Sequence, residues 1–125
     1  MAKQHSSRFL AISQAARDVV QECEAHELEA MMNDGEPLVV LDVREREEYE
    51  AGHLIGCVHL GRGVLERDIE KMGYADDLRM VLYCGGGYRS AMAAKALQEM
   101  GWTNVISLWE GWRGIQAQGL PIWQP

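Results

Sequence analysis

Residues 80–100 read MVLYCGGGYRSAMAAKALQEM, and three local patterns follow one another within them. The apolar run from Met80 to Tyr83 is too continuous for a half-exposed strand and is typical of a buried parallel strand. Three glycines follow Cys84, and from Tyr88 to Met100 small and apolar residues recur with the period of a helix. A buried strand that passes through a glycine-rich loop directly into a helix predicts an α/β fold.

The same alternation of strand and helix extends along the rest of the chain. Predicted strands begin near residue 19 and span residues 38–43, 58–60, 80–83 and 105–108; predicted helices span 7–18, 25–33, 45–51, 63–72, 88–100 and 112–118. Such an alternation calls for a parallel sheet with helices on both faces. Ligand sites in these sheets lie beyond the carboxyl ends of the strands, which is where Cys84 is expected.

Length and composition indicate the number of domains and the classes of partner that the chain can have. The 125 residues contain no repeat and no low-complexity linker, which favours one domain over residues 19–125 preceded by a helical extension over residues 1–18. A formal net charge of −7 argues against nucleic acid as a partner. No run approaches the roughly 18 apolar residues of a membrane span, and the first 20 residues do not resemble a secretory signal. We therefore expect a cytoplasmic protein without a membrane partner.

The three cysteines are an odd number and lack CxxC spacing. This pattern predicts neither a disulfide framework nor a zinc site, and free thiols in a reducing compartment fit better. The histidines also lack the spacing of a metal site. We expect no metal and no cofactor.

The loop after Cys84 has the composition of an anion-binding nest. Gly85, Gly86 and Gly87 reach positive φ without steric cost, so that successive backbone N–H groups can point inward. Together with the start of the helix at Tyr88, they favour a negative charge such as a thiolate or a persulfide on Cys84. The alternative is a structural cysteine before a phosphate-binding loop, which would normally carry Lys and Ser or Thr after its glycines.

Two polar side chains follow the glycines and are candidates for the site. Arg89 is expected to turn back over the loop and to bind an anionic substrate group through its planar guanidinium. Ser90 is expected to donate a hydrogen bond to the sulfur or to cap the helix.

Several motifs, in this order along the chain, resemble the rhodanese family. They are LDVRE at residues 41–45, EYEAGHL at 48–54 with Gly56 after it, CGGGYRSAMAAKALQEMGW at 84–102, and NVISL followed by GW and GLPI within 104–122. The resemblance covers residues 19–125. It implies a three-layer α/β domain with a central five-stranded parallel sheet flanked by helices. It also implies a catalytic Cys84 whose persulfide is held by the amides of Gly85, Gly86, Gly87, Tyr88 and Arg89.

The length of the loop bears on the chemistry that the resemblance implies. Residues 84–89 make up six residues, as in the sulfurtransferases of the family, whereas related cell-cycle phosphatases carry one more. The resemblance thus favours sulfur over phosphorus or arsenic. Two departures from the family pattern, Glu110 in place of a glycine and Ile115 in place of a tryptophan, leave open the backbone after the last strand and the shape of one pocket wall.

Other candidate residues have a structural and a functional interpretation. Asp42 and Arg44 can support the site by orienting the loop, but such a pair is more often a structural ion pair. For Glu48 and His53 we expect a role in fixing a turn rather than in proton transfer. Cys23 is a candidate sulfur relay only if it folds close to Cys84, and Cys57 is expected to pack as a small core residue. Arg62 and Arg67 are either cations beside the site or part of a solvated face. The tryptophans can line a pocket but are more often core or rim residues; they are Trp102, Trp109, Trp112 and Trp123.

The sequence thus predicts a sulfurtransferase that works by double displacement through a Cys84 persulfide. The expected donor is thiosulfate or another persulfide, and the expected acceptor is cyanide, a thiol or a protein thiol. The alternative is a persulfide carrier or sensor for a protein partner with little turnover of its own.

Overall fold

The predicted alternation of strands and helices is present in the computed structural model, which describes residues 4–125. Residues 1–3 of the predicted 1–18 extension lie outside the described residues. The elements are α1 (Ser7–Arg17), β1 (Gln21–Cys23), α2 (Ala25–Met32), β2 (Leu38–Asp42), α3 (Arg46–Ala51), β3 (His53–Leu54), β4 (Val58–His59), the 3-10 helix η1 (Arg62–Val64), α4 (Leu65–Asp68), the 3-10 helix η2 (Ile69–Met72), β5 (Arg79–Tyr83), α5 (Tyr88–Glu99), β6 (Val105–Leu108), α6 (Gly111–Gln118) and β7 (Ile122–Trp123).

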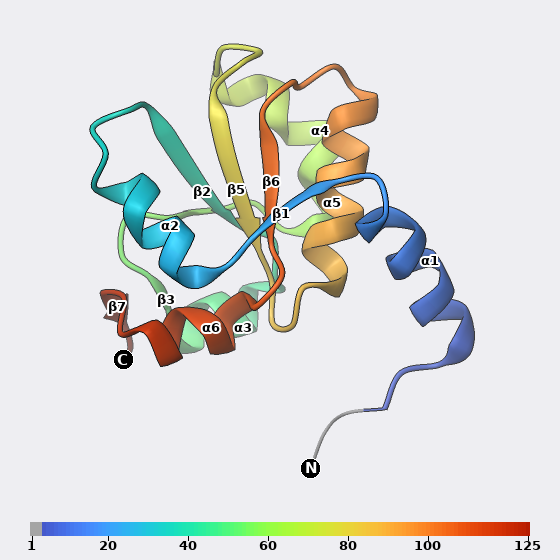
Figure 1. Cartoon of the computed structure of the whole chain (residues 1–125), viewed down its shortest axis with the longest axis horizontal. Coiled ribbons are helices and arrows are strands. Elements are labelled where there is room, and N and C mark those ends of the chain that lie inside the picture. Colours follow the sequence, from blue (N-terminus) through green and yellow to red (C-terminus); the bar gives the residue numbers. More distant parts are fainter. Residues whose placement is uncertain (1–3) are drawn as a thin grey trace.

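The central sheet has five strands in the order β1-β6-β5-β2-β4, and every pair is parallel. β5 lies in the middle, between β2 and β6, so the loop after β5 emerges at the centre of the carboxyl edge (Figure 1). At the outer edge, Gln21 of β1 is paired with Ile106 of β6. The predicted five-stranded parallel sheet is confirmed.

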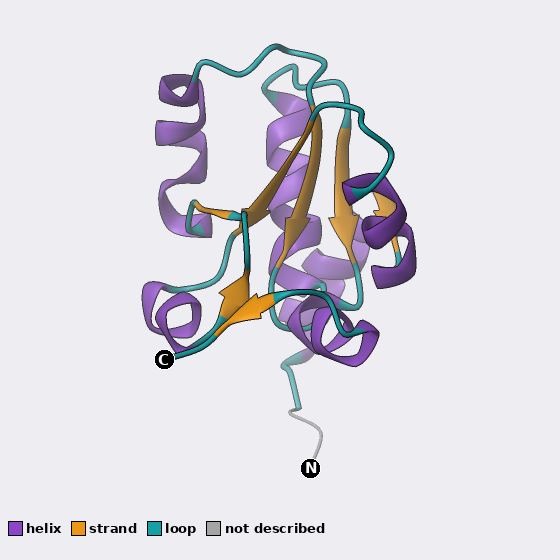
Figure 2. Ribbon diagram, turned by 90° about the vertical axis from the view of Figure 1, so that its left-hand side faces the viewer, coloured by secondary structure: helices purple, strands orange, loops and turns teal. Residues whose placement is uncertain are grey.

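Helices cover both faces of this sheet (Figure 2), and a separate apolar core fills each interface. Alternate residues of β5 point to opposite faces, so Met80 and Leu82 enter one core while Val81 and Tyr83 enter the other. The first core is completed by residues of α4, η2 and α5, and the second by residues of α2 and α6. This arrangement is the predicted three-layer domain.

The N-terminal helix α1 packs against α5 on the outside of the domain (Figure 1). Its N-cap is Ser6, whose Oγ accepts a hydrogen bond from the Phe9 N–H at 3.2 Å. Ser13 and Ala16 are its buried residues, and small side chains there allow the two helices to approach closely. Over residues 4–125, no helix is both long enough and apolar enough to cross a bilayer.

Three local predictions differ from the structure. The helix expected over 63–72 is divided into η1, α4 and η2, because Val64 has φ −124° and ψ 3°, outside the helical region. The first strand begins at Gln21 rather than at Val19. The antiparallel pair of β3 and β7 was not predicted, since strands of two residues are too short to show an alternating pattern.

Candidate active site

Cys84 lies at the carboxyl end of β5, immediately before the loop that leads into α5. Its side chain is 1% exposed, and its Sγ accepts hydrogen bonds from the N–H groups of Gly87 (3.1 Å) and Ser90 (3.3 Å). The Ser90 hydroxyl is 3.5 Å from the sulfur and 2.9 Å from the Ser107 hydroxyl, which orients it. Donors on one side of the sulfur stabilise negative charge on it.

The glycine loop is held against the loop that follows β6. Gly87 has φ 89°, and a Cβ there would lie 2.3 Å from the carbonyl oxygen of Trp109. Gly111 has φ 62°, and a Cβ there would lie 2.4 Å from the carbonyl oxygen of Gly85. Between these two contacts the Trp112 N–H donates to the Cys84 carbonyl oxygen at 2.7 Å. Glycine is therefore required in both loops for their backbones to come this close.

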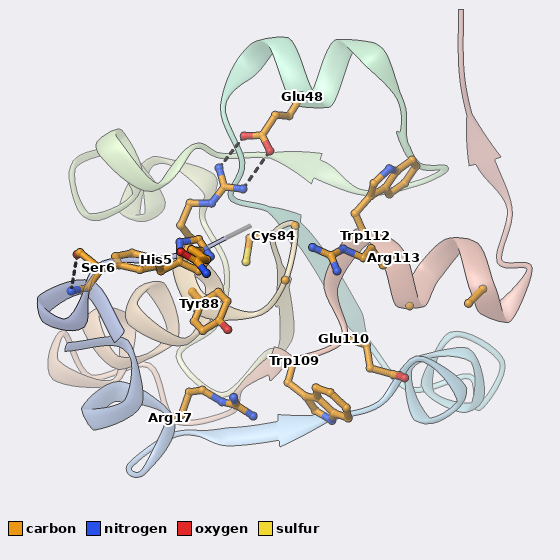
Figure 3. A pocket seen from close by; sticks show the side chains of 17 residues that line it. His5, Ser6, Arg17, Glu48, Cys84, Tyr88, Trp109, Glu110, Trp112 and Arg113 are labelled. Atoms are coloured by element: carbon orange, nitrogen blue, oxygen red, sulfur yellow. Dashed lines mark hydrogen bonds and ion pairs between the residues drawn. The ribbon is translucent and has the colours of Figure 1, made fainter. Parts of the chain in front are cut away.

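Of the five predicted anion-binding amides, only that of Gly87 donates to the sulfur of Cys84 itself, and the second amide donor is Ser90, whose N–H was not among them. Gly85, Gly86, Tyr88 and Arg89 instead line the cavity into which this sulfur faces. The cavity has a volume of about 1170 Å³ and is open to solvent on one side. Its other lining residues come from the segment 4–17, from α3 and from residues 109–117, and Figure 3 shows them around Cys84.

The guanidinium of Arg89 lies over the start of the loop, with Nη2 3.3 Å from the position that a Cβ on Gly85 would occupy. Its two terminal nitrogens donate to the Glu48 carboxylate at 2.6 and 3.0 Å, the ion pair marked by dashed lines in Figure 3. The hydrogen bonds from Arg89 hold the pKa of Glu48 below its usual value, so the pair stays charged at neutral pH. Glu48 also accepts the Glu45 N–H at the start of α3. The pair thus ties α5 to α3 beside the cavity.

Asp42 and Arg44 form a buried ion pair on the other side of the loop. Arg44 Nη2 donates to Asp42 at 2.8 Å and to the Gly52 carbonyl oxygen at 2.6 Å, and its guanidinium lies 4.8 Å from the Trp112 ring centroid. The Tyr83 hydroxyl donates to Asp42 at 2.7 Å. These bonds connect β2, α6 and the start of β3 without reaching Cys84. This geometry favours a structural ion pair over a direct role of Asp42 and Arg44 at Cys84.

Replacing Arg44 with methionine should lower the free energy of unfolding by about 3–5 kcal/mol, because Asp42 would then be a buried carboxylate without a counter-charge. Urea denaturation of the wild-type protein and of the Arg44→Met variant measures this difference in the free energy of unfolding. The matched control is Arg46→Met, an exposed arginine two residues further on, which should change the stability by less than about 0.5 kcal/mol. A loss below about 1 kcal/mol in Arg44→Met would contradict the structural role of the pair.

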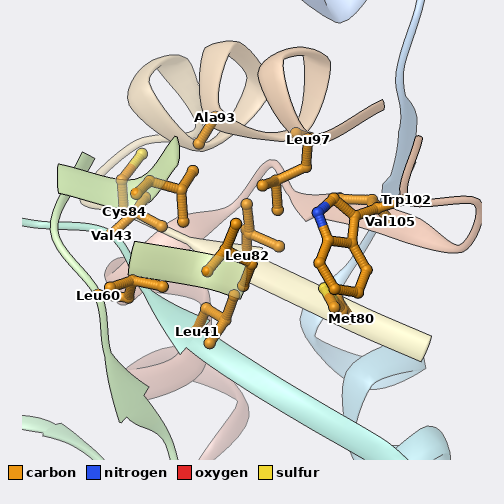
Figure 4. Packing of buried hydrophobic residues seen from close by; sticks show 13 residues of the cluster. Leu41, Val43, Leu60, Met80, Leu82, Cys84, Ala93, Leu97, Trp102 and Val105 are labelled. Atoms are coloured by element: carbon orange, nitrogen blue, oxygen red, sulfur yellow. The ribbon is translucent and has the colours of Figure 1, made fainter. Parts of the chain in front are cut away.

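The remaining cysteines pack apart from Cys84. Cys84 belongs to the core between the sheet and α5 (Figure 4), whereas Cys23 belongs to the core on the opposite face and Cys57 packs against that second core. Burial, and then the neighbouring Glu27, Glu110, Glu22 and Glu24, raise the pKa of Cys23 to about 12. Burial raises the pKa of Cys57 to about 11. The arrangement gives no support to Cys23 as a sulfur relay.

In the native protein, iodoacetamide should therefore modify Cys84 and leave the other two cysteines intact. At about pH 8 the thiolate fraction of Cys23 is roughly 10⁻⁴ and that of Cys57 roughly 10⁻³, and the thiolate is the form that reacts. Peptide mass spectrometry after brief labelling, with and without denaturant, reports each site. Comparable labelling of Cys57 and Cys84 in the folded protein would be the contrary result.

Several residues of the cavity were not predicted from the sequence. His5 and Phe9 of the N-terminal segment contact the ring of Tyr88, with centroid distances of 4.8 and 5.7 Å, and nothing in the sequence signals this. Arg113 could have been found, because it follows a strand whose carboxyl end lies beside that of β5. Arg62 and Arg67, for which a place beside the site and a solvated face were both open, are paired with Glu66 and Asp68 and do not line the cavity.

The two departures from the family pattern also have defined places. Glu110 has a helical backbone, with φ −74° and ψ −21°, and its side chain accepts the Ala25 N–H at 2.5 Å, which ties α6 to the start of α2. Ile115 is fully buried in the core beneath α6. Among the tryptophans, Trp109 and Trp112 line the cavity, Trp102 is in the core, and Trp123 stacks on His53.

The parallel sheet and its central loop define an α/β domain with a buried cysteine whose sulfur accepts two backbone N–H groups. Residues 24–118 match the model of the Rhodanese-like domain family. The chain belongs to this family, which confirms the resemblance noted from its motifs. Sulfur transfer is thus the chemistry that the family suggests.

Two curated relatives are similar to this chain. The chain is 37% identical over 82 residues to the putative sulfur carrier protein YrkF of Bacillus subtilis, covering 66% of this chain and 43% of that protein. It is 31% identical over 115 residues to a tRNA uridine(34) hydroxylase of Cronobacter sakazakii, covering 86% of this chain and 33% of that protein. The chain therefore spans less than half the length of these curated relatives.

Among solved structures, the polysulfide-sulfur transferase homodimer of Wolinella succinogenes shares the fold. The TM-score is 0.80 at 24% identity, and the match covers 95% of this chain and 89% of that one.

Proposed function

We propose that this chain is a sulfurtransferase that carries a sulfane sulfur as a persulfide on Cys84. The observation that carries the proposal is the sulfur of Cys84, which accepts two backbone N–H groups and faces an open cavity. The six-residue loop of residues 84–89 and the likeness to a putative sulfur carrier support it.

The proposed reaction has two displacement steps. The Cys84 thiolate attacks the outer sulfur of thiosulfate; a new S–S bond forms, the old one breaks, and sulfite leaves with the bonding electron pair. A thiolate or cyanide then attacks the outer sulfur of the persulfide, and the electron pair of that S–S bond returns to Cys84. Splitting one transfer into two steps is the advantage of covalent catalysis.

The surrounding groups have separate parts in this reaction. The N–H groups of Gly87 and Ser90 stabilise the Cys84 thiolate before attack and after release. The loop backbone of Gly85 and Gly86 borders the space for the second sulfur. The pair of Arg89 and Glu48 keeps the first turn of α5 in place.

The decisive experiment is mass spectrometry of the protein after incubation with thiosulfate. The expected result is a gain of one sulfur atom that maps to the peptide containing Cys84 and disappears on addition of cyanide. Failure to gain sulfur from thiosulfate, polysulfide and glutathione persulfide alike would overturn the proposal, as would a sulfur atom that maps to Cys23 or Cys57.

A second candidate function is a persulfide carrier for a partner protein, which the likeness to YrkF favours. Both candidates share the Cys84 persulfide, but they differ in turnover. Steady-state formation of thiocyanate from thiosulfate and cyanide identifies the enzyme. A single stoichiometric transfer to a partner thiol, without such turnover, identifies the carrier.

A further inference from the structure

The charges around the cavity are not evenly matched. Three arginines and two glutamates line it, in a chain with a formal net charge of −7. Arg89 is held by Glu48, and Arg17 is held by Glu22 at 2.9 and 3.3 Å. The remaining arginine, Arg113, forms no hydrogen bond and no ion pair with any group in residues 4–125. It is therefore the cavity arginine whose guanidinium is free for a ligand.

The position of Arg113 is well defined even though its side chain is exposed. It is the third residue of α6, directly after Trp112, whose N–H is bonded to the carbonyl oxygen of Cys84. Gly111, the first residue of α6, lies so close to the loop that a Cβ there would be 2.4 Å from the Gly85 carbonyl oxygen. The first turn of α6 is thus fixed to the active-site loop, and Figure 3 shows Arg113 extending from it toward Cys84.

We propose that Arg113 binds the anionic oxygen atoms of the sulfur donor, while Arg89 acts only through its ion pair with Glu48. This inference rests on the proposed function. It names the donor class as an anionic sulfane-sulfur compound with a sulfonate or carboxylate group near the S–S bond. A guanidinium presents two parallel N–H donors to such a group, and a local cation offsets the repulsion that an acidic protein exerts on an anion.

The test compares two alkylating reagents of similar size and different charge, and it requires no sulfur transfer. Iodoacetate is an anion and iodoacetamide is neutral, so the ratio of their rates at Cys84 reports the local positive charge. Arg113→Ala should lower this ratio about tenfold, the effect of losing one charge-assisted contact. Arg113→Lys should lower the ratio by a smaller factor, because the positive charge is kept. The same Arg113→Ala protein should show about a tenfold higher KM for thiosulfate with a much smaller change in kcat.

Two control variants separate the loss of an anion contact at Arg113 from the loss of any surface charge and from a change in the loop. Arg8→Ala removes an exposed positive charge of α1 that does not line the cavity, and it should leave the ratio unchanged. The double variant Arg89→Ala/Glu48→Ala removes the ion pair as a unit and keeps the net charge of the cavity, so it should slow both reagents by similar factors.

The outcomes distinguish this inference from the proposed function. An unchanged ratio in Arg113→Ala, or an equal fall in Arg8→Ala, overturns the role of Arg113 even if the wild-type protein transfers sulfur. A fall confined to Arg113→Ala, together with the rise in KM, supports it. A fall in the ratio without persulfide formation by the wild-type protein overturns the donor assignment together with the proposed function.

Discussion

Replacing Cys84 with serine is expected to reduce sulfur transfer at least about a thousandfold, because a hydroxyl group cannot form the persulfide on which covalent transfer depends. The fold should be unchanged, since serine is nearly isosteric and its Oγ can still accept the N–H groups of Gly87 and Ser90. The measurements are the rate of thiocyanate formation and the mass gain after incubation with thiosulfate. Circular dichroism checks the fold.

The matched controls for this variant are the other two cysteines. Cys23→Ala and Cys57→Ala should remain active, because both thiols pack on the opposite face of the sheet from Cys84. More than a trace of activity in Cys84→Ser would show that the nucleophile has been misassigned. Loss of activity in a folded Cys23→Ala protein would point instead to a relay thiol.

The second large effect is expected for Gly111→Ala. A Cβ at this position would lie 2.4 Å from the Gly85 carbonyl oxygen and 2.7 Å from that of Cys84, so the two loops must separate. A displacement of about 1 Å at a reacting group can cost roughly a hundredfold in rate, and we expect a loss of this size in kcat/KM for thiosulfate. The positive φ of 62° adds a backbone penalty of about 1–2 kcal/mol to the loss of stability.

Gly73→Ala separates the effect of the positive φ from the effect of the contact between the loops. Gly73 has a similar φ of 71°, but nothing lies within 4 Å of the position that its Cβ would occupy. This variant should lose about 1 kcal/mol of stability and keep its rate of sulfur transfer. Equal rates for the Gly73 and Gly111 variants would show that the contact between the loops does not hold Cys84 in place.

The fold could be predicted from the sequence to the extent that its elements carry a pattern of their own. The continuous apolar runs that end at Val43 and Tyr83 are buried on both faces of the sheet, so the parallel arrangement follows from composition. β3 and β7 carry no such pattern, because their pairing depends on where α6 brings the C-terminal segment. The division of the 63–72 segment at Val64 was not predicted, because Val64, Leu65, Ile69 and Met72 keep a helical spacing and the non-helical backbone of Val64 leaves no mark in that pattern.

The candidate site shows the same limit at the level of side chains. Cys84 and the loop glycines are adjacent in the chain, and local chemistry was enough to identify them. The ion pair of Arg89 could not be predicted in this way, because its partner Glu48 lies 41 residues away in the sequence. Arg113 was not predicted, because a single arginine in a helix has no motif of its own; only its position after β6, whose carboxyl end lies beside that of β5, could have indicated it.

The position of β1 at the edge of the sheet has a consequence for the order of folding during synthesis. Gln21 pairs only with β6, at Ile106, and α1 packs on α5, so residues 4–23 find their partners only after residues 88–108 have been synthesised. Contacts between such distant residues slow folding, because the intervening chain must first be ordered. Until then the backbone groups of β1 stay unpaired, and we expect residues 4–23 to dock last onto a sheet already formed by β2, β4, β5 and β6.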